Sequence, residues 1–424
     1  MDIYRTGMNP GTFNLVNGSC HRRQEEIAAV KRFLVSNRWR EEGGVNQADL
    51  VIFFACGAMR LNVDEMMVSL TDVIGKMKNG AELVVGGCLP RTDSERLSQV
   101  FTGKTITYAD YTALDTLPGV ENRFETLPKV FGNGAFCPPL VKPGLRKAGA
   151  LRLVRLSLDL ARVLMRHRPT SILRRIASRL RQYERMVISV GAGCSRTCPY
   201  CAKRFALGPV RSKPAEKVMQ RIAAGRMLGY RTFDLFADSI GDYGQDLGTD
   251  FGALLDSIAD FEAAVSVGIY DLHPEDFIRY FDRILGLCKT DRLHYLYVIT
   301  ESGNARVLRS MRREIDTVDL ARKLQAIRGY KSVFMQTAII VGYPGETDEE
   351  FDDTLALLGE VNFDNVYVHC YCDMPNTESS RLDGKISKET VSRRLRRIAA
   401  AGIRHSVSEA RRECDHSFPW GSLG

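Results

Sequence analysis

From Met186 onward, short apolar runs rich in β-branched residues alternate with segments whose apolar residues recur three and four positions apart. The runs are typical of buried strands and the segments of amphipathic helices. The strand-like runs are MVISVGA (186–192), TFDLFAD (232–238), AAVSVGI (263–269), YLYVIT (295–300), VFMQTAIIVG (333–342) and NVYVHCY (365–371). Six such β-α units over residues 186–405 predict a parallel sheet, open or curled into a partial barrel. In such folds, chemistry takes place at the C-terminal ends of the strands.

Residues 1–135 contain a smaller alternation that predicts an open parallel-sheet α/β domain. Helical EEIAAVKRFLV is followed by the strand DLVIFFAC, by helical VDEMMVSLTDVIGKM and by the strand AELVVGGC. Cys56 and Cys88 end the two strands, and Cys20 lies in the polar loop NGSCHRR before the first helix. We expect all three thiols to converge on one edge of the sheet. The alternative is that they are packing residues, since free cysteine is often buried.

A basic segment, residues 136–185, separates these two domains, and residues 406–424 form a C-terminal tail. Between 141 and 186 there are thirteen Lys and Arg and two acidic residues, a local excess of +11 in a chain whose net charge is +8. The pattern predicts two basic amphipathic helices broken at Pro169. Such a surface suits phosphates, an acidic peptide or an anionic membrane surface; a solvated linker is the alternative. The candidate substrate-binding residues are Arg155, Arg162 and Arg166.

The composition is that of a soluble globular protein, with 44% apolar and 26% charged residues. The N-terminus MDIYRTGMNPGTF lacks the order of a signal peptide, and no long uncharged apolar run predicts a membrane span. We therefore expect a cytoplasmic protein. In that reducing compartment the eleven cysteines are metal ligands or free thiols rather than a disulfide framework.

The stretch CSRTCPYC places three thiols, Cys194, Cys198 and Cys201, directly after the first strand of the larger array. Thiolates are soft ligands for iron-sulfur clusters or zinc. Zinc normally takes four ligands, and no His or fourth Cys lies nearby, so a zinc knuckle or buried free cysteines are the weaker alternatives. Three ligands on a cluster of four irons leave one iron open, where a substrate can bind and receive an electron.

This CxxxCxxC loop resembles the loop of the radical S-adenosylmethionine (SAM) superfamily, and the rest of the chain is similar to its methylthiotransferases. The similar segments are RSKP (211–214), DLFADSIGDYGQDLG (234–248), LHP (272–274), TESGNARVLRSMRR (300–313), AIIVGYPGETDEEF (338–351) and YCDMPNTESSRL (371–382). By itself GYPGET would indicate only a turn. The resemblance covers about residues 1–130 and 186–400 and includes both cysteine sets in the family's order.

The resemblance implies a partial (β/α)6 radical SAM barrel with two [4Fe-4S] clusters. One cluster is held by the catalytic Cys194, Cys198 and Cys201, and the other by Cys20, Cys56 and Cys88. SAM is radical source and methyl donor, and the product carries a methylthio group at a formerly unactivated C–H bond. An electron donor such as flavodoxin or ferredoxin is the implied partner. The residues implied to bind SAM are Tyr200, Asp238, Ser239, Glu301, Ser302, Val341 and Gly342.

The chain departs from the family at several positions. Leu207 and Gly208 stand where the family usually has Arg followed by Gly, Glu301 where Gln is common, and Cys372 where Ser is common. Cys370 and Cys372 are two apart on a predicted strand and are expected to point the same way, as packing residues or as thiols near the active site.

Substrate identity is the least constrained prediction. Relatives that act on transfer RNA or a ribosomal protein carry a small C-terminal β-barrel, and we expect this chain to lack it because few residues follow RRLRRIAAAGI. The basic segment has few aromatic residues for stacking on RNA. Both points favour a peptide or protein side chain, such as a ribosomally made peptide natural product. A tRNA base is the second hypothesis. Another radical SAM peptide modification, such as crosslinking, and a cluster protein that only carries electrons are further alternatives.

Overall fold

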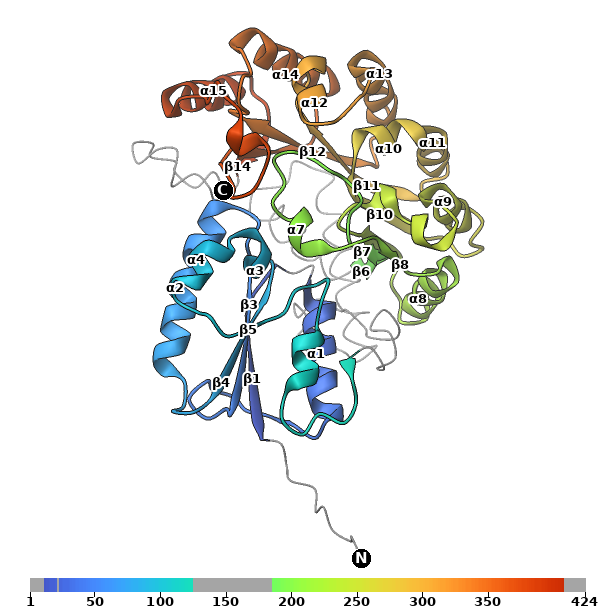
Figure 1. Ribbon diagram of the computed structural model, residues 1–424. Coiled ribbons are helices and arrows are strands. Elements are labelled where there is room, and N and C mark those ends of the chain that lie inside the picture. The colour runs from blue at the N-terminus through green and yellow to red at the C-terminus, as the bar shows by residue number, and fades with distance from the viewer. Residues whose placement is uncertain (1–10, 21–22, 125–184, 408–424) are drawn as a thin grey trace, which may run out of the picture.

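The computed structural model describes residues 11–20, 23–124 and 185–407. The predicted basic helices, with Arg155, Arg162 and Arg166, and almost all of the C-terminal tail lie outside the described residues. Figure 1 shows two α/β units, an N-terminal one (11–124) and a larger one that we call the barrel unit (185–407). In the described part of the chain, no helix combines the length and apolar character that a membrane crossing requires.

The N-terminal unit is built on a parallel sheet, which within the described residues has five strands in the order β2-β1-β3-β4-β5. The sequence did not predict β1, whose Asn14 and Asn17 are poor strand formers, although this strand pairs on both sides. The elements of the N-terminal unit are β1 (Thr12–Gly18), α1 (Gln24–Ser36), β2 (Arg40–Glu41), β3 (Leu50–Ala55), α2 (Arg60–Lys76), β4 (Glu82–Gly87), α3 (Leu89–Thr92), α4 (Ser94–Ser98), β5 (Lys104–Thr105) and the 3-10 helix η2 (Thr112–Thr116).

The continuous apolar run of β3 explains why helices cover both faces of this sheet. Alternate strand residues point to opposite faces. Leu50, Ile52 and Phe54 pack in one buried cluster with residues of α1, and Val51, Phe53 and Ala55 in a second with residues of α2. Because each face is buried, a register slip of one residue would exchange the two sets, so the ends of β1, β3 and β4 are held in line.

The barrel unit is an open parallel sheet of seven described strands in the order β14-β13-β12-β11-β10-β9-β6. The strands are β6 (Arg185–Ser189), β9 (Thr232–Phe236), β10 (Ser266–Leu272), β11 (Leu293–Glu301), β12 (Phe334–Val341), β13 (Asn365–Cys370) and β14 (His405–Val407). The predicted α/β partial barrel is confirmed. The short edge strand β14 was not predicted.

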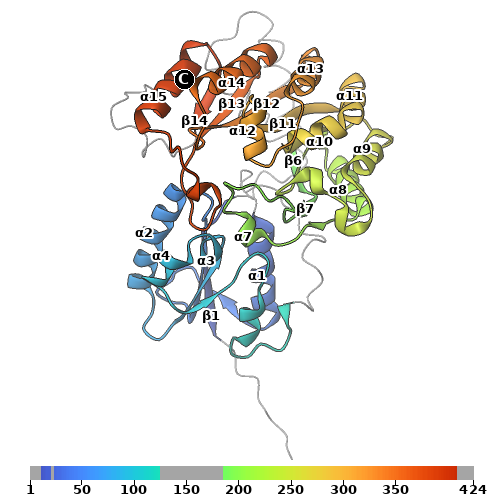
Figure 2. The ribbon, with the colours of Figure 1, turned by 45° about the horizontal axis from the view of Figure 1, so that its top comes forward.

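Helices follow the strands and cover the outer face of the sheet (Figures 1 and 2). They are α8 (Ala215–Met227), α9 (Phe251–Ala259), α10 (Pro274–Arg279), α11 (Phe281–Lys289), α12 (Ala305–Ser310), α13 (Thr317–Arg328), α14 (Asp348–Val361) and α15 (Lys388–Ala400). The stretch EDFIRYFDRILGL has the apolar spacing of a single helix but forms two, because the chain leaves helical geometry at Tyr280.

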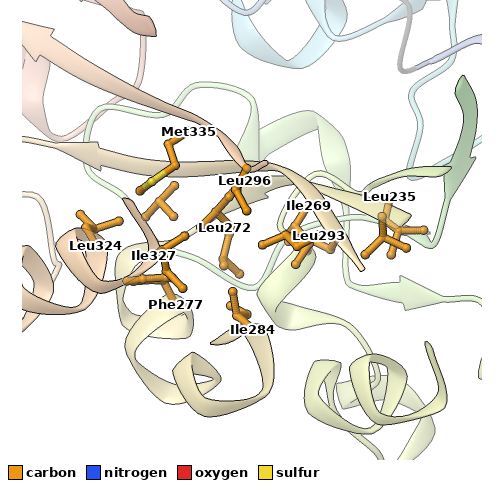
Figure 3. Close-up of a cluster of buried hydrophobic side chains, with 14 of the residues drawn as sticks. Leu235, Ile269, Leu272, Phe277, Ile284, Leu293, Leu296, Leu324, Ile327 and Met335 are labelled. Carbon is orange, nitrogen blue, oxygen red and sulfur yellow. The ribbon is translucent and has the colours of Figure 1, made fainter. Parts of the chain in front are cut away.

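The core of the barrel unit lies between this sheet and its helices. In Figure 3, Leu235, Ile269, Leu296 and Met335 project from neighbouring strands toward Phe277, Ile284, Leu324 and Ile327 of the helices. Full burial of each such side chain contributes about 1.5–3 kcal/mol. The strands are thereby fixed, and so are the loops that leave their C-terminal ends.

The two units meet at the C-terminal ends of their sheets. Helix α3 lies beside α7 (Arg204–Leu207), a short helix after the cysteine loop (Figure 2). Cys88 and Tyr108 share a buried cluster with Ala206, and Ala202 packs against the apolar cluster that contains Phe53. The predicted cysteine loop of the barrel unit therefore packs directly on the N-terminal unit.

Candidate functional site

The first three cysteines to consider lie in a closed loop. After β6, the strand β7 (Gly191–Ala192) pairs antiparallel with β8 (Arg211–Ser212) and ties the two ends of the loop together. Gly193 has φ +86°, and a Cβ there would lie 1.9 Å from the carbonyl oxygen of Pro209, so only glycine fits. The loop carries Cys194, Cys198 and Cys201, which we call the first thiol set.

The thiols of the first set lie close enough to influence one another. Cys198 is buried, and the amide of Arg196 donates to Cys194 Sγ over 3.4 Å. Burial, with smaller contributions from Asp242 and the neighbouring thiolates, raises the pKa of the Cys194 thiol to about 12, although the hydrogen bond from the Arg196 amide opposes the shift. The pKa of Cys198 is raised by the same desolvation. A bound metal centre would favour the ionised form of these thiols.

The second thiol set, Cys20, Cys56 and Cys88, follows three neighbouring strands. Gly18 of β1 pairs with Ala55 of β3, and Ala55 pairs with Gly87 of β4, so the strands end level with one another. Burial raises the pKa of Cys88 to about 12, while Arg23 opposes this shift, and the charges of Cys56 and Cys20 add to it. The structure thus brings these three residues to one edge of the sheet, as the sequence led us to expect.

Neither set has the geometry of a site for a single ion. Among the described residues, no three or more His, Cys, Asp or Glu side chains surround a point that could hold one metal ion. In a cubane each thiolate binds a different iron, so its ligands stand farther apart than the ligands of one zinc ion. Each set supplies three soft donors, which fit a [4Fe-4S] cluster in donor chemistry, and of the six thiols Cys20 is exposed while the other five are partly or fully buried.

An acidic cluster that the sequence analysis missed holds the first thiol set in place. Arg196 Nε lies 3.1 Å from Asp242 Oδ1, Nη1 lies 3.2 Å from Glu275 Oε2, and Nη2 bonds Asp276 Oδ2. Asp242 also accepts from the amide of Ser195 at 3.0 Å. Both aspartates are fully buried, so the guanidinium compensates their charges. The charged residues within CSRTC and DSIGDYG were the features of the sequence that could have predicted this cluster.

A second buried group connects the loop to the end of β11. Tyr200 donates its hydroxyl to Glu301 Oε1 at 2.9 Å and accepts from Arg313 Nη2 at 2.8 Å. Glu301 has φ +64°, and its Oε2 is buried with no hydrogen-bond partner. An unpaired buried carboxylate oxygen is costly, and it is an acceptor available to a bound ligand. The fully buried Arg313, within SMRR, was missed by the sequence analysis.

The other residues implied to bind SAM lie at the ends of β9, β11 and β12 and have different surroundings. Asp238 Oδ2 accepts from the amide of Gly193 at 2.9 Å, while Ser239 Oγ is buried without a partner. Ser302 Oγ lies 3.2 Å from Thr354 Oγ1.

Val341 packs its side chain into the core, and its carbonyl accepts from the amide of Tyr371 at 2.9 Å. Gly342 has φ +89°, and a Cβ there would lie 2.7 Å from Val391 Cγ2. Val391 therefore occupies the place that a side chain at residue 342 would take, and both residues of this pair are buried.

Cys370 and Cys372 do not point the same way, contrary to the prediction. Strand β13 ends at Cys370, which packs in the helix-covered core, while Cys372 packs against the apolar cluster of the N-terminal unit. Strand alternation no longer applies once the strand has ended.

Comparison with known proteins agrees with this geometry. The model of the radical SAM superfamily matches residues 188–358. A tRNA-2-methylthio-N(6)-dimethylallyladenosine synthase from Pelotomaculum thermopropionicum is 24% identical over 415 residues, which are 95% of this chain and 84% of that protein. A ribosomal protein uS12 methylthiotransferase from Protochlamydia amoebophila is 24% identical over 394 residues, or 91% of this chain and 75% of the relative. The chain thus carries a radical SAM domain and is similar to methylthiotransferases along most of its length.

Two further similarities cover less of the chain or concern its structure. A threonylcarbamoyladenosine tRNA methylthiotransferase from Thermotoga maritima is 33% identical over 217 residues, which are half of this chain and 49% of the relative. The solved structure of the radical SAM methyltransferase TsrM from Kitasatospora setae gives a TM-score of 0.56 at 13% identity, and covers 87% of this chain and 74% of its own. This likeness supports the fold. The radical SAM domain implies a [4Fe-4S] cluster and SAM as cofactors.

Proposed function

We propose that this radical SAM methylthiotransferase inserts a methylthio group into an unactivated C–H bond, using two [4Fe-4S] clusters. The observation that carries the proposal is the presence of two three-thiol sets, each at the C-terminal edge of a parallel sheet, on units that meet at those edges. A protein that only carries electrons would not need the buried, unpaired Glu301 Oε2 and Ser239 Oγ beside the first set.

The chain's own residues hold and orient the reactants in this proposal. The first thiol set would hold the cluster that supplies an electron for the cleavage of SAM, and the second set the cluster that supplies sulfur. Glu301 Oε2 accepts, and Ser239 Oγ donates, hydrogen bonds to polar groups of SAM. Val341 and Gly342, at the end of β12, would contact its adenosine. Tyr200 and Arg313 fix the rotamer of Glu301.

For the substrate we propose a peptide or protein side chain, with a tRNA base as the second candidate. Relatives that align along most of this chain include one named for a ribosomal protein and one named for tRNA, so that each candidate has support. A role for Arg155, Arg162 and Arg166 in substrate binding belongs to this proposal. The same holds for a cytoplasmic location and for flavodoxin or ferredoxin as electron donor.

Mass spectrometry of the small RNA and peptide fractions tests the proposal. Cells that make the protein should gain a product heavier by one CH2S unit, about 46 mass units, than cells that make the Cys194→Ala variant. A gain on peptide supports the first candidate, and a gain on RNA replaces it with the second. A product without added sulfur in either fraction would reject methylthio transfer.

A further inference from the structure

Arg23, which the mechanism above does not use, lies at the boundary between the two units. It comes three residues after Cys20, directly before α1, and is only 4% exposed. Its Nη1 lies 2.8 Å from Glu26 Oε1 in its own unit, and its Nη2 bonds Asp238 Oδ1 in the barrel unit. Its Cζ lies 4.7 Å from the ring centre of Tyr108, a cation–π distance. Every group around this guanidinium is therefore fixed.

Asp238 connects this ion pair to the first thiol set. While Oδ1 bonds Arg23, Oδ2 accepts from the amide of Gly193 at 2.9 Å, one residue before Cys194. The Asp238 side chain is 3% exposed. One continuous chain of contacts thus runs from the segment after Cys20, across the boundary, to the glycine that begins the cysteine loop.

The charge of Arg23 also acts on the second thiol set. Burial by itself would lower the pKa of Arg23, but Asp238, Glu26, Cys88 and Cys20 raise it, so the guanidinium stays positive. From the barrel unit, Lys203 acts in the same direction on Cys56 and Cys88 as Arg23 does. The second set is therefore flanked by two cations, one from each unit.

Two other contacts cross the same boundary and serve as a comparison. Lys213 Nζ lies 2.9 Å from Glu25 Oε2, and Arg211 Nη2 donates to the carbonyl of Tyr108 at 2.8 Å. The Lys213–Glu25 pair resembles the Arg23–Asp238 pair in kind and place. Arg23 lies on the ring of Tyr108, which shares a buried cluster with Cys88, whereas Lys213 pairs with Glu25, outside that cluster. This difference separates a purely structural contact from one that acts on the thiols.

We propose that Arg23 is a positioning residue of the second thiol set: its ion pair with Asp238 fixes this set relative to the cysteine loop, and its charge stabilises the reduced state of a cluster held there. This rests on the proposed second cluster. A reduced cluster carries one more negative charge than the oxidised one, and a nearby fixed cation raises the reduction potential. The electron comes from the external donor.

The test is a redox titration of the reconstituted full-length protein, with each cluster followed by its electron paramagnetic resonance signal. In Arg23→Gln the second cluster should become harder to reduce by about tenfold in the one-electron equilibrium, about 59 mV. Arg23→Lys keeps the charge and should restore most of that shift. The first cluster should not move in either variant. Lys213→Gln, which breaks the comparison pair, should move neither potential.

Asp238→Asn gives the opposite sign and keeps the proposal testable if Arg23→Gln fails to fold. It removes an anion and leaves the cation, so the second cluster should become easier to reduce. An unchanged potential in Arg23→Gln, or a shift in the same direction in both variants, overturns the role of Arg23 while two clusters remain. A wild-type protein with iron for one cluster only would instead refute the proposed function itself.

Discussion

The two thiol sets share one backbone feature but are assembled differently. In each, a glycine with positive φ stands directly before a cysteine at the C-terminal edge of a sheet, Gly193 before Cys194 and Gly87 before Cys88. The first set comes from one loop, whereas the second comes from the ends of three strands. Burial raises the pKa of Cys194 in the first set and of Cys88 in the second; Asp242 adds to the shift of Cys194, whereas Arg23 opposes the shift of Cys88.

This difference shows what each set depends on. The spacing within one loop is local, so the first set needs only the β7–β8 pair and the Arg196 contacts to keep its shape. The second set needs the register of β1, β3 and β4 to be right. Damage to sheet packing in the N-terminal unit should therefore disturb the second set more than the first.

Removal of each thiol set should have the largest effect and should separate the two roles. Reconstituted wild-type protein is expected to hold about eight irons, and a triple Cys→Ala variant of either set about four. The variant of the first set should lose SAM cleavage. The variant of the second set should keep SAM cleavage and lose the methylthio product. Iron analysis and SAM turnover measure this, and full iron in either triple variant would contradict the assignment of that set.

The two glycines allow the same separation without loss of a thiol. A Cβ at residue 193 would lie 1.9 Å from Pro209 O, and one at residue 87 would lie 2.4 Å from Ala55 O. Gly193→Ala should lose iron from the first set and Gly87→Ala from the second, each with a loss of unfolding free energy of about 3 kcal/mol or more.

Gly80→Ala is the matched control for backbone strain. Gly80 has φ +81°, and a Cβ there meets nothing within 4 Å. This variant should cost only about 1–2 kcal/mol, the strain of a left-handed residue with a side chain, and should keep both clusters. If it lost iron like the other two, the steric argument would be wrong.

Arg196→Gln should have a smaller effect, confined to the first set. It leaves the buried Asp242 and Asp276 without their cation, which should cost about 3 kcal/mol. Arg196→Lys keeps the charge but not the forked geometry and should cost less. Urea unfolding together with the iron content of each site measures this, and equal losses of iron from both sets would show that the two sets are not independent.

Much of this architecture could be predicted because its signals are periodic or local. The apolar run of β3 and the cysteine spacing of CSRTCPYC each fall within fewer than ten consecutive residues. Strand β1 was missed since its Asn residues break the strand pattern, and it forms because β3 and β2 pair with it. EDFIRYFDRILGL keeps a helical period across Tyr280, so sequence periodicity gave no sign of the break there.

Contacts between distant segments could not be predicted. Arg23 and Asp238 are 215 positions apart, and Tyr200 and Glu301 are 101 apart. Each is an ordinary polar residue in its own segment. Their roles follow from the meeting of the two sheet edges, which no local pattern contains. The orientation of Cys372 was missed because the end of a strand is set by tertiary pairing.

Both units contain a buried Glu beside an Arg. The pairs are Glu26 with Arg23 and Glu346 with Arg394. Glu346, in the GYPGET loop, is 2% exposed, and its Oε1 has no partner. Burial raises its pKa from 4.5 to about 7, although Arg394 opposes the shift. The folded state therefore binds the proton more tightly than the unfolded state does.

The sign of the pH dependence follows from this. The stabilisation is fully present below about pH 4.5 and is lost as pH rises through about 7, so wild-type stability should fall relative to Glu346→Gln by about 2 kcal/mol between pH 5 and pH 8. Asp348→Asn is the control: Arg394 and Arg393 lower the pKa of Asp348, so its contribution is lost only in acid and stays constant over this range. Urea unfolding at the two pH values decides the matter. If the difference in unfolding free energy between wild type and Glu346→Gln were the same at both pH values, Arg394 would keep Glu346 ionised throughout. The GYPGET loop would then contain no group that titrates in this range.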